Sequence, residues 1–145
     1  MSDRLAASIQ ADRHARGIHG ATWTIEDRGA RPLTLNRVMG LHRMQWATHT
    51  RVARLRWWAL AVQAHIPQLE RISVDVTPLH KDGRSPQDPV ACAAEFKAAL
   101  DGLVDARVIP GDHGAHVVCV TFWPPDICGH DGMRLTITNR PGGPT

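Results

Sequence analysis

Three aspartates and a lysine are spaced along one predicted helix and its flanks in the middle of the chain. Asp88 opens a helix-favouring run that extends to about residue 106, with Lys97 and Asp101 four positions apart within it. Asp112 follows in a turn. Carboxylates from separate elements are ligands that Mg²⁺ prefers, and an ammonium group beside them can neutralise a phosphate. These residue types would suit phosphodiester chemistry with a bound divalent cation, if the fold brings them together.

Each of these side chains also has a purely structural explanation. Asp88 before Pro89 is typical of an N-cap followed by the first helical position, and an N-cap contributes about 1 kcal/mol. Lys97 and Asp101 can form an exposed ion pair worth a few tenths of a kcal/mol. Asp112 is a common turn residue. Taken one at a time, the residues favour these simpler roles.

Apolar periodicity predicts the elements that position these residues. The central helix carries one apolar stripe, formed by Cys92, Phe96, Ala99, Leu100 and Leu103. A longer helix is predicted over 41–65, and strands over 21–26, 71–79, 116–123 and 133–138, with a short strand-like segment at 33–38. We expect the 71–79 strand to be half-buried and the last two strands to pair as a hairpin.

The order strand, helix, strand, helix, strand, strand predicts one α+β domain over 20–140, with a mixed β-sheet and two main helices. Residues 1–19 are polar and basic and are predicted to be a flexible arm or a short helix. The chain contains no apolar run of membrane-spanning length and no signal-peptide centre, which predicts a cytoplasmic protein. Three cysteines at irregular spacing favour free thiols over a disulfide framework or a zinc site.

The helix over 41–65 combines arginine with tryptophan. Its three-four spacing favours an apolar stripe over Leu41, Met44, Thr48, Val52, Leu55, Ala59 and Val62. We interpret Trp57 and Trp58 as core or interface residues, and regard stacking of their rings on DNA bases as the alternative. The candidate DNA contacts are Arg43, Arg51, Arg54, Lys81 and Arg84. Plain solvation is the alternative for these cations.

Charge is distributed unevenly along the chain. The net charge is +3, but the first 60 residues carry ten basic and four acidic side chains, whereas the remainder carries seven basic and ten acidic ones. Most of the basic residues are arginines, whose guanidinium groups match phosphate geometry. A polyanion-binding surface beside a carboxylate site fits this distribution, and so does an ordinary solvated surface.

The ordered residues Asp88, Lys97, Asp101-Gly102-Leu103 and Asp112 resemble the motifs of the RusA-like crossover (Holliday) junction endodeoxyribonucleases, a family common in phages and prophages. The later segment GHDGMRLTIT resembles the closing turn and last strand of that family, and the similarity covers roughly residues 20–140. The resemblance implies a homodimer that resolves four-way DNA junctions in recombination and repair. It also implies Mg²⁺, with Mn²⁺ as a substitute, held by Asp88 and Asp112, with Lys97 as the essential lysine and Asp101 orienting it.

The sequence departs from the family pattern beside Asp88. Val90 stands where a second aspartate is expected, and Ala91 where an asparagine is expected. Valine cannot bind a metal, so the alternative is a catalytically impaired RusA-like protein that binds branched DNA. The missing ligand could be replaced by His113, by water, or by one of two other carboxylates in the chain, Glu95 and Asp75.

Overall fold

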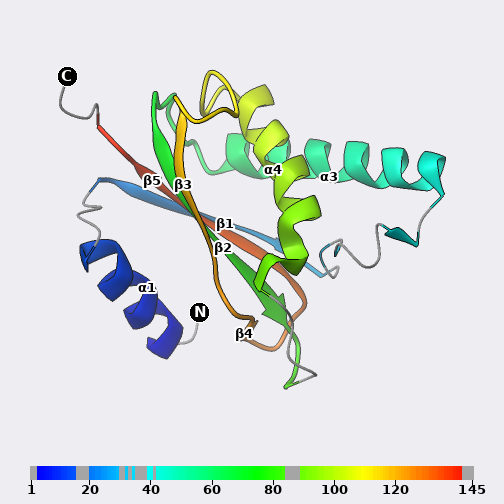
Figure 1. Cartoon of the computed structure of the whole chain (residues 1–145), viewed down its shortest axis with the longest axis horizontal. Helices are drawn as coiled ribbons and strands as arrows, with labels where there is room; N and C mark the ends of the chain where they lie inside the picture. Colours follow the sequence, from blue (N-terminus) through cyan, green and yellow to red (C-terminus); the bar gives the residue numbers. More distant parts are fainter. Residues whose placement is uncertain are drawn as a thin grey trace.

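The computed structural model describes residues 3–15, 20–29, 32, 34, 39–40, 42–83 and 89–141. Within them the chain forms an α+β domain with a mixed sheet, as the sequence predicts, and three α-helices (Figure 1). The helices are α1 (Asp3–Ala15), α3 (Arg43–Gln63) and α4 (Ala93–Asp105), the last preceded by a 3₁₀ turn over Pro89–Cys92. The strands are β1 (Thr22–Arg28), β2 (Ile72–His80), β3 (Val117–Phe122), β4 (Asp126–Ile127) and β5 (Gly132–Asn139).

The sheet has the order β1-β5-β2-β3, and β4 pairs with the end of β2. β5 is antiparallel to β1 and to β2, whereas β3 is parallel to β2. The predicted hairpin between 116–123 and 133–138 is therefore wrong, because β2 lies between those two strands. β2 is buried along its whole length, so the backbone groups on both of its edges need hydrogen-bonding neighbours.

Helices α3 and α4 cover one face of the sheet, and the core lies between them and the strands. Trp57 of α3 is fully buried there, together with every residue of the stripe predicted for the central helix. The two helices approach closely at Gly102, where a Cβ atom would lie 2.6 Å from the carbonyl oxygen of Arg54. Glycine at this position is therefore what permits the α3–α4 contact.

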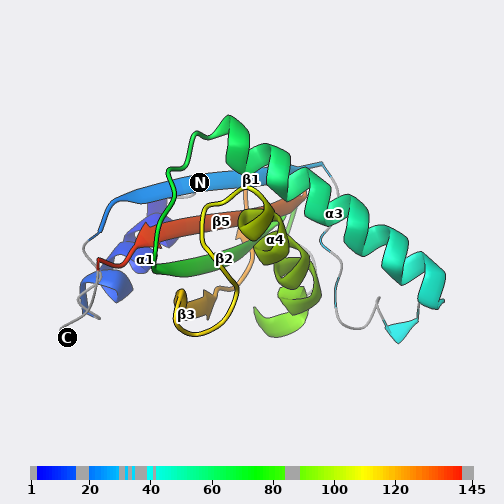
Figure 2. The same ribbon diagram turned by 90° about the horizontal axis from the view of Figure 1, so that it is seen from above.

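The second face of the sheet is polar, and α1 lies on this side (Figures 1 and 2). Ser73, Asp75 and Thr77 of β2 point to it and are buried, so the prediction of a half-buried β2 is wrong. On the same face Arg134 of β5 donates through Nε to Glu26, at 2.8 Å, and through Nη1 to Asp126, at 3.1 Å. Cross-strand hydrogen bonds and ion pairs thus replace an apolar core on this side.

The predicted apolar stripe of the long helix is also wrong. The residues that α3 buries are Ala53, Trp57 and Ala61, whereas Met44 and Leu55 of the predicted stripe are 74% and 63% exposed. Figure 2 shows the reason, because the N-terminal half of α3 extends beyond the edge of the sheet. The small side chains of Ala53 and Ala61, one on either side of Trp57 in the buried stripe, let the helix approach α4 and the sheet.

Residues 3–15 form the helix α1, one of the two alternatives for the N-terminal segment. Of the 33–38 segment, only residue 34 is among those described. The central helix begins with a 3₁₀ turn, and the N-cap of α4 itself is Cys92, which makes no side-chain capping bond. None of the helices in the described ranges is both long enough and apolar enough to span a bilayer.

Candidate functional site

Lys97 lies between two carboxylates on the exposed face of α4. Its Nζ atom donates to Asp101 Oδ1 at 3.1 Å and also to Asp112 Oδ2. Lys97 and Asp101 meet because they are one helical turn apart, whereas Asp112 comes from the loop that follows the helix. The structure therefore brings together three of the four residues predicted to be catalytic.

The loop that carries Asp112 is fixed by the end of α4. Arg107 adopts a left-handed conformation, with φ +60°, and the amide of Arg107 donates to Val104 O while that of Val108 donates to Leu103 O, each at 3.0 Å. This pair of bonds is a Schellman motif, which reverses the chain direction. Val108 and Ile109 are then buried in the core, and the chain turns back along α4. Asp112 reaches Lys97 as a result.

The charges in this cluster stabilise one another. The hydrogen bond to Asp112 and, second, that to Asp101 raise the pKa of the Lys97 ammonium above its ordinary value. The same bond from Lys97 lowers the pKa of the Asp112 carboxyl group. At neutral pH Lys97 is therefore a cation and not a base, which suits neutralisation of a phosphate and not proton abstraction.

The remaining motif positions lie at the start of the central helix. Asp88 and Arg84 fall outside the described residues. Val90 lies in the 3₁₀ turn with about half of its surface exposed, and Cys92 at the end of that turn is buried. The position where the family pattern expects a second carboxylate thus presents an isopropyl group to solvent.

Two carboxylates suggested as substitute ligands are engaged elsewhere. Glu95 is buried in the core, where it accepts a hydrogen bond from Trp57 Nε1 at 3.3 Å. Asp75 is buried on the polar sheet face and accepts from Trp123 Nε1 at 2.9 Å. Across the described part of the chain, no three His, Cys, Asp or Glu side chains are grouped so that they could hold a metal ion. Asp112 is the predicted metal ligand that the structure describes.

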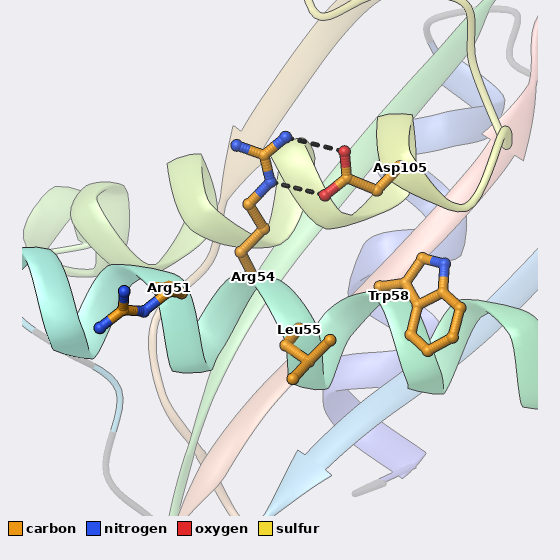
Figure 3. A pocket seen from close by; sticks show the side chains of 5 residues that line it. All are labelled: Arg51, Arg54, Leu55, Trp58 and Asp105. Carbon is orange, nitrogen blue, oxygen red and sulfur yellow. Dashed lines mark hydrogen bonds and ion pairs between the residues drawn. The ribbon is translucent and has the colours of Figure 1, made fainter.

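Arg54 is not free to contact a phosphate, because it binds Asp105 in a fork-shaped ion pair. Nε lies 2.5 Å from Asp105 Oδ2 and Nη2 lies 2.7 Å from Oδ1, which joins α3 to α4 (Figure 3). This hydrogen bond lowers the pKa of Asp105 and, with a smaller contribution from the charge of Asp101, raises that of Arg54. A row of charged side chains thus runs from α3 across α4 to the Lys97 cluster.

Two open grooves follow α3 beside this row. One, of about 480 Å³, is lined by Arg51, Arg54, Leu55, Trp58 and Asp105. The other, of about 390 Å³, is lined by Arg43, Trp46, Ala47, Thr50, Arg51 and Arg54. The predicted DNA contacts Arg43 and Arg51 therefore line grooves, whereas Lys81 lies in the loop after β2.

Sequence reasoning missed Trp46 and Asp105 as members of these surfaces. Both carry a signal in their spacing, since Trp46, Thr50 and Arg54 recur every four residues on α3, and Asp105 follows Asp101 by four on α4. Of the two tryptophans considered from the sequence, Trp57 is fully buried, as predicted, whereas Trp58 lines a groove and is 40% exposed.

The resemblance to the RusA-like nucleases expected above rests on the ordered motif residues of the sequence alone. The structure brings together Lys97, Asp101 and Asp112 of that set. No protein-family model matches this chain, and no curated protein matches it.

Proposed function

We propose that this protein is a metal-dependent, structure-selective endonuclease that resolves four-way DNA junctions, similar to the RusA-like family. The observation that carries the proposal is the contact of Lys97 with both Asp101 and Asp112, which come from two separate elements. Lys97 is exposed, so its ammonium lies within reach of a phosphate that approaches this surface, although Asp101 and Asp112 already hold it. The adjoining arginine-lined grooves of α3 supply a path for a polyanion.

In this proposal Asp88 and Asp112 hold Mg²⁺, with Mn²⁺ as a substitute. One or two carboxylates, together with substrate phosphate and water, are the usual protein contribution to Mg²⁺ sites of this kind, and Lys97 contacts one of the two oxygens of Asp112. The metal would activate the attacking water and stabilise the charge that develops on the phosphate. Lys97 neutralises the departing oxygen, and Asp101 holds the lysine in position.

The DNA backbone is proposed to lie along α3, with Arg43 and Arg51 as contacts and Lys81 and Arg84 contacting it near the start of the central helix. A homodimer suits the substrate, since two equivalent strands of a junction require two identical sites. Action in recombination and repair places the protein with the genome of a bacterial cell, and so in the cytoplasm, with a phage or prophage origin consistent with the resemblance.

A second candidate function is binding of branched DNA without cleavage. The exposed side chain of Val90 favours it, because a carboxylate is expected at that place in an active enzyme. In this case Val90→Asp should create metal-dependent cleavage. Strong cleavage by the unaltered protein would eliminate this second candidate.

The deciding experiment uses a labelled four-way junction with Mg²⁺, with Mn²⁺ and with EDTA. We expect paired, symmetric nicks that disappear in EDTA and in the variants Asp112→Asn and Lys97→Met. Glu70→Gln is the matched control, because Glu70 is exposed and lies outside the cluster. Binding without nicks in either metal would support the second candidate, and cleavage that survives Lys97→Met would contradict the proposed site.

A further inference from the structure

The N-terminal half of α3 leaves apolar and aromatic side chains without cover. Every residue from Arg43 to His49 is exposed, and Met44, Trp46 and Val52 present large apolar surfaces. In the C-terminal half, Leu55, Trp58 and Val62 are also exposed. Exposed large apolar side chains along a water-facing helix indicate an interaction surface.

The charge of α3 indicates the class of partner. The helix carries four arginines and no acidic residue, and the grooves along it place Trp46 beside Arg43 and Trp58 beside Arg51. The carboxylate of Asp105, which also borders a groove, is neutralised by Arg54. Two copies of this face brought together would oppose arginine to arginine, whereas a polyanion with aromatic groups would match both the charge and the rings.

We infer that α3 binds a single strand of nucleic acid, with unpaired bases stacked on Trp46 and Trp58 and the intervening phosphates held by Arg43 and Arg51. The two tryptophans are twelve residues apart, which is about 18 Å along the helix axis. Both residues are partly exposed, at 46% and 40%, so each offers surface on which a base could stack. Base stacking on aromatic side chains tolerates any sequence.

This inference deepens the proposed function. It rests on that proposal only for the class of partner, which is nucleic acid. A junction resolvase that also holds unpaired bases would favour junctions opened at the branch point over fully paired ones. Stacking on α3 requires neither Lys97 nor a metal ion, so the two proposals fail independently. Lys97→Met is expected to abolish nicking and to leave strand binding unchanged.

The test is fluorescence anisotropy in EDTA at low salt with three labelled probes. These are a thymidine strand of about 16 nucleotides, an abasic strand of the same length, and a duplex. We expect the thymidine strand to bind most tightly. Trp46→Ala and Trp58→Ala should each weaken its binding by about 5-fold to 150-fold, with little effect on the abasic strand.

The controls separate stacking from general apolar contact and from misfolding. Trp46→Phe retains an aromatic ring and should keep most of the affinity, whereas Met44→Ala, on the same exposed part of α3, should bind like the unaltered protein. Equal affinity for the thymidine and abasic strands would overturn the inference. So would a dimer that Trp46→Ala dissociates while strand binding is unchanged, because the surface would then belong to a second copy.

Discussion

Replacement of Gly102 by alanine tests how closely α3 and α4 must pack for the grooves to exist. An added Cβ would lie 2.6 Å from Arg54 O, 2.9 Å from Trp58 N and 3.0 Å from Trp57 Cβ. The two shortest contacts are to backbone atoms, so no side-chain rotation relieves them. The helices must separate along the segment where Arg54 binds Asp105.

The expected loss of stability follows from two opposing effects. Alanine in place of glycine favours a helix by about 1 kcal/mol. Overpacking against a rigid neighbour costs roughly 1–3 kcal/mol, and contacts to backbone place Gly102→Ala at or somewhat above the upper end. The net destabilisation is therefore about 2 kcal/mol, which lowers the melting temperature by roughly 4–8 °C for a chain of this size.

Urea denaturation and thermal melts followed by circular dichroism measure this loss. Gly114→Ala is the matched control, because nothing lies within 4 Å of a Cβ atom at that position. It should leave the unfolding midpoint unchanged or slightly raised. A Gly102→Ala protein as stable as the control would refute the packing argument, and with it the account of how α3 is held against α4.

Three further predictions concern single side chains. Arg107→Gly should stabilise the protein by about 1 kcal/mol in urea, because φ +60° strains a residue with a Cβ atom and does not strain glycine. Arg54 lowers the pKa of the Asp105 carboxyl group, so the stabilisation that this ion pair gives the fold is fully present above the unfolded-state pKa of about 3.9. This stabilisation is lost as the pH falls through the lower folded-state pKa. The stability difference between the unaltered protein and Asp105→Asn, no more than about 1 kcal/mol for so exposed a pair, should therefore vanish in strong acid. Arg134→Met should destabilise the fold by about 3–5 kcal/mol, measured by urea denaturation, since it removes the buried cation that pairs with the carboxylates of Asp126 and Glu26.

Local spacing was enough to predict the contact of Lys97 with Asp101, whereas the grouping of Asp112 with Lys97 in one site was expected only from the family resemblance. Lys97 and Asp101 meet through the geometry of one helical turn, and Asp112 follows a helix end that the sequence marks with Pro110 and Gly111. The apolar stripe of the central helix was also predicted in full, since all five of its residues are buried in the core. Predictions succeeded where neighbours in the sequence decide the structure.

The errors arose where distant segments decide burial. The spacing of residues along α3 is compatible with more than one buried stripe. The stripe that is buried contains Ala53 and Ala61, and these small residues, with Gly102 of α4, permit the two helices to approach closely. The alternating polar residues of β2 are typical of a solvent-facing side. The structure instead places α1 on that side, and Trp123 supplies the hydrogen bond that the buried Asp75 requires.

The pairing of β1 with β5 has a consequence for how the protein folds. Thr22 lies opposite Thr138, and within the described residues β5 is the strand that pairs with β1 and is also the antiparallel neighbour of β2. Contacts so distant in the sequence form slowly, because a long loop must close before they contribute stability. The helices α3 and α4 are therefore expected to associate first, and a chain shortened before residue 132 should lack the strand that joins β1 to β2. On the ribosome, the domain would acquire its core only after its final strand had been synthesised.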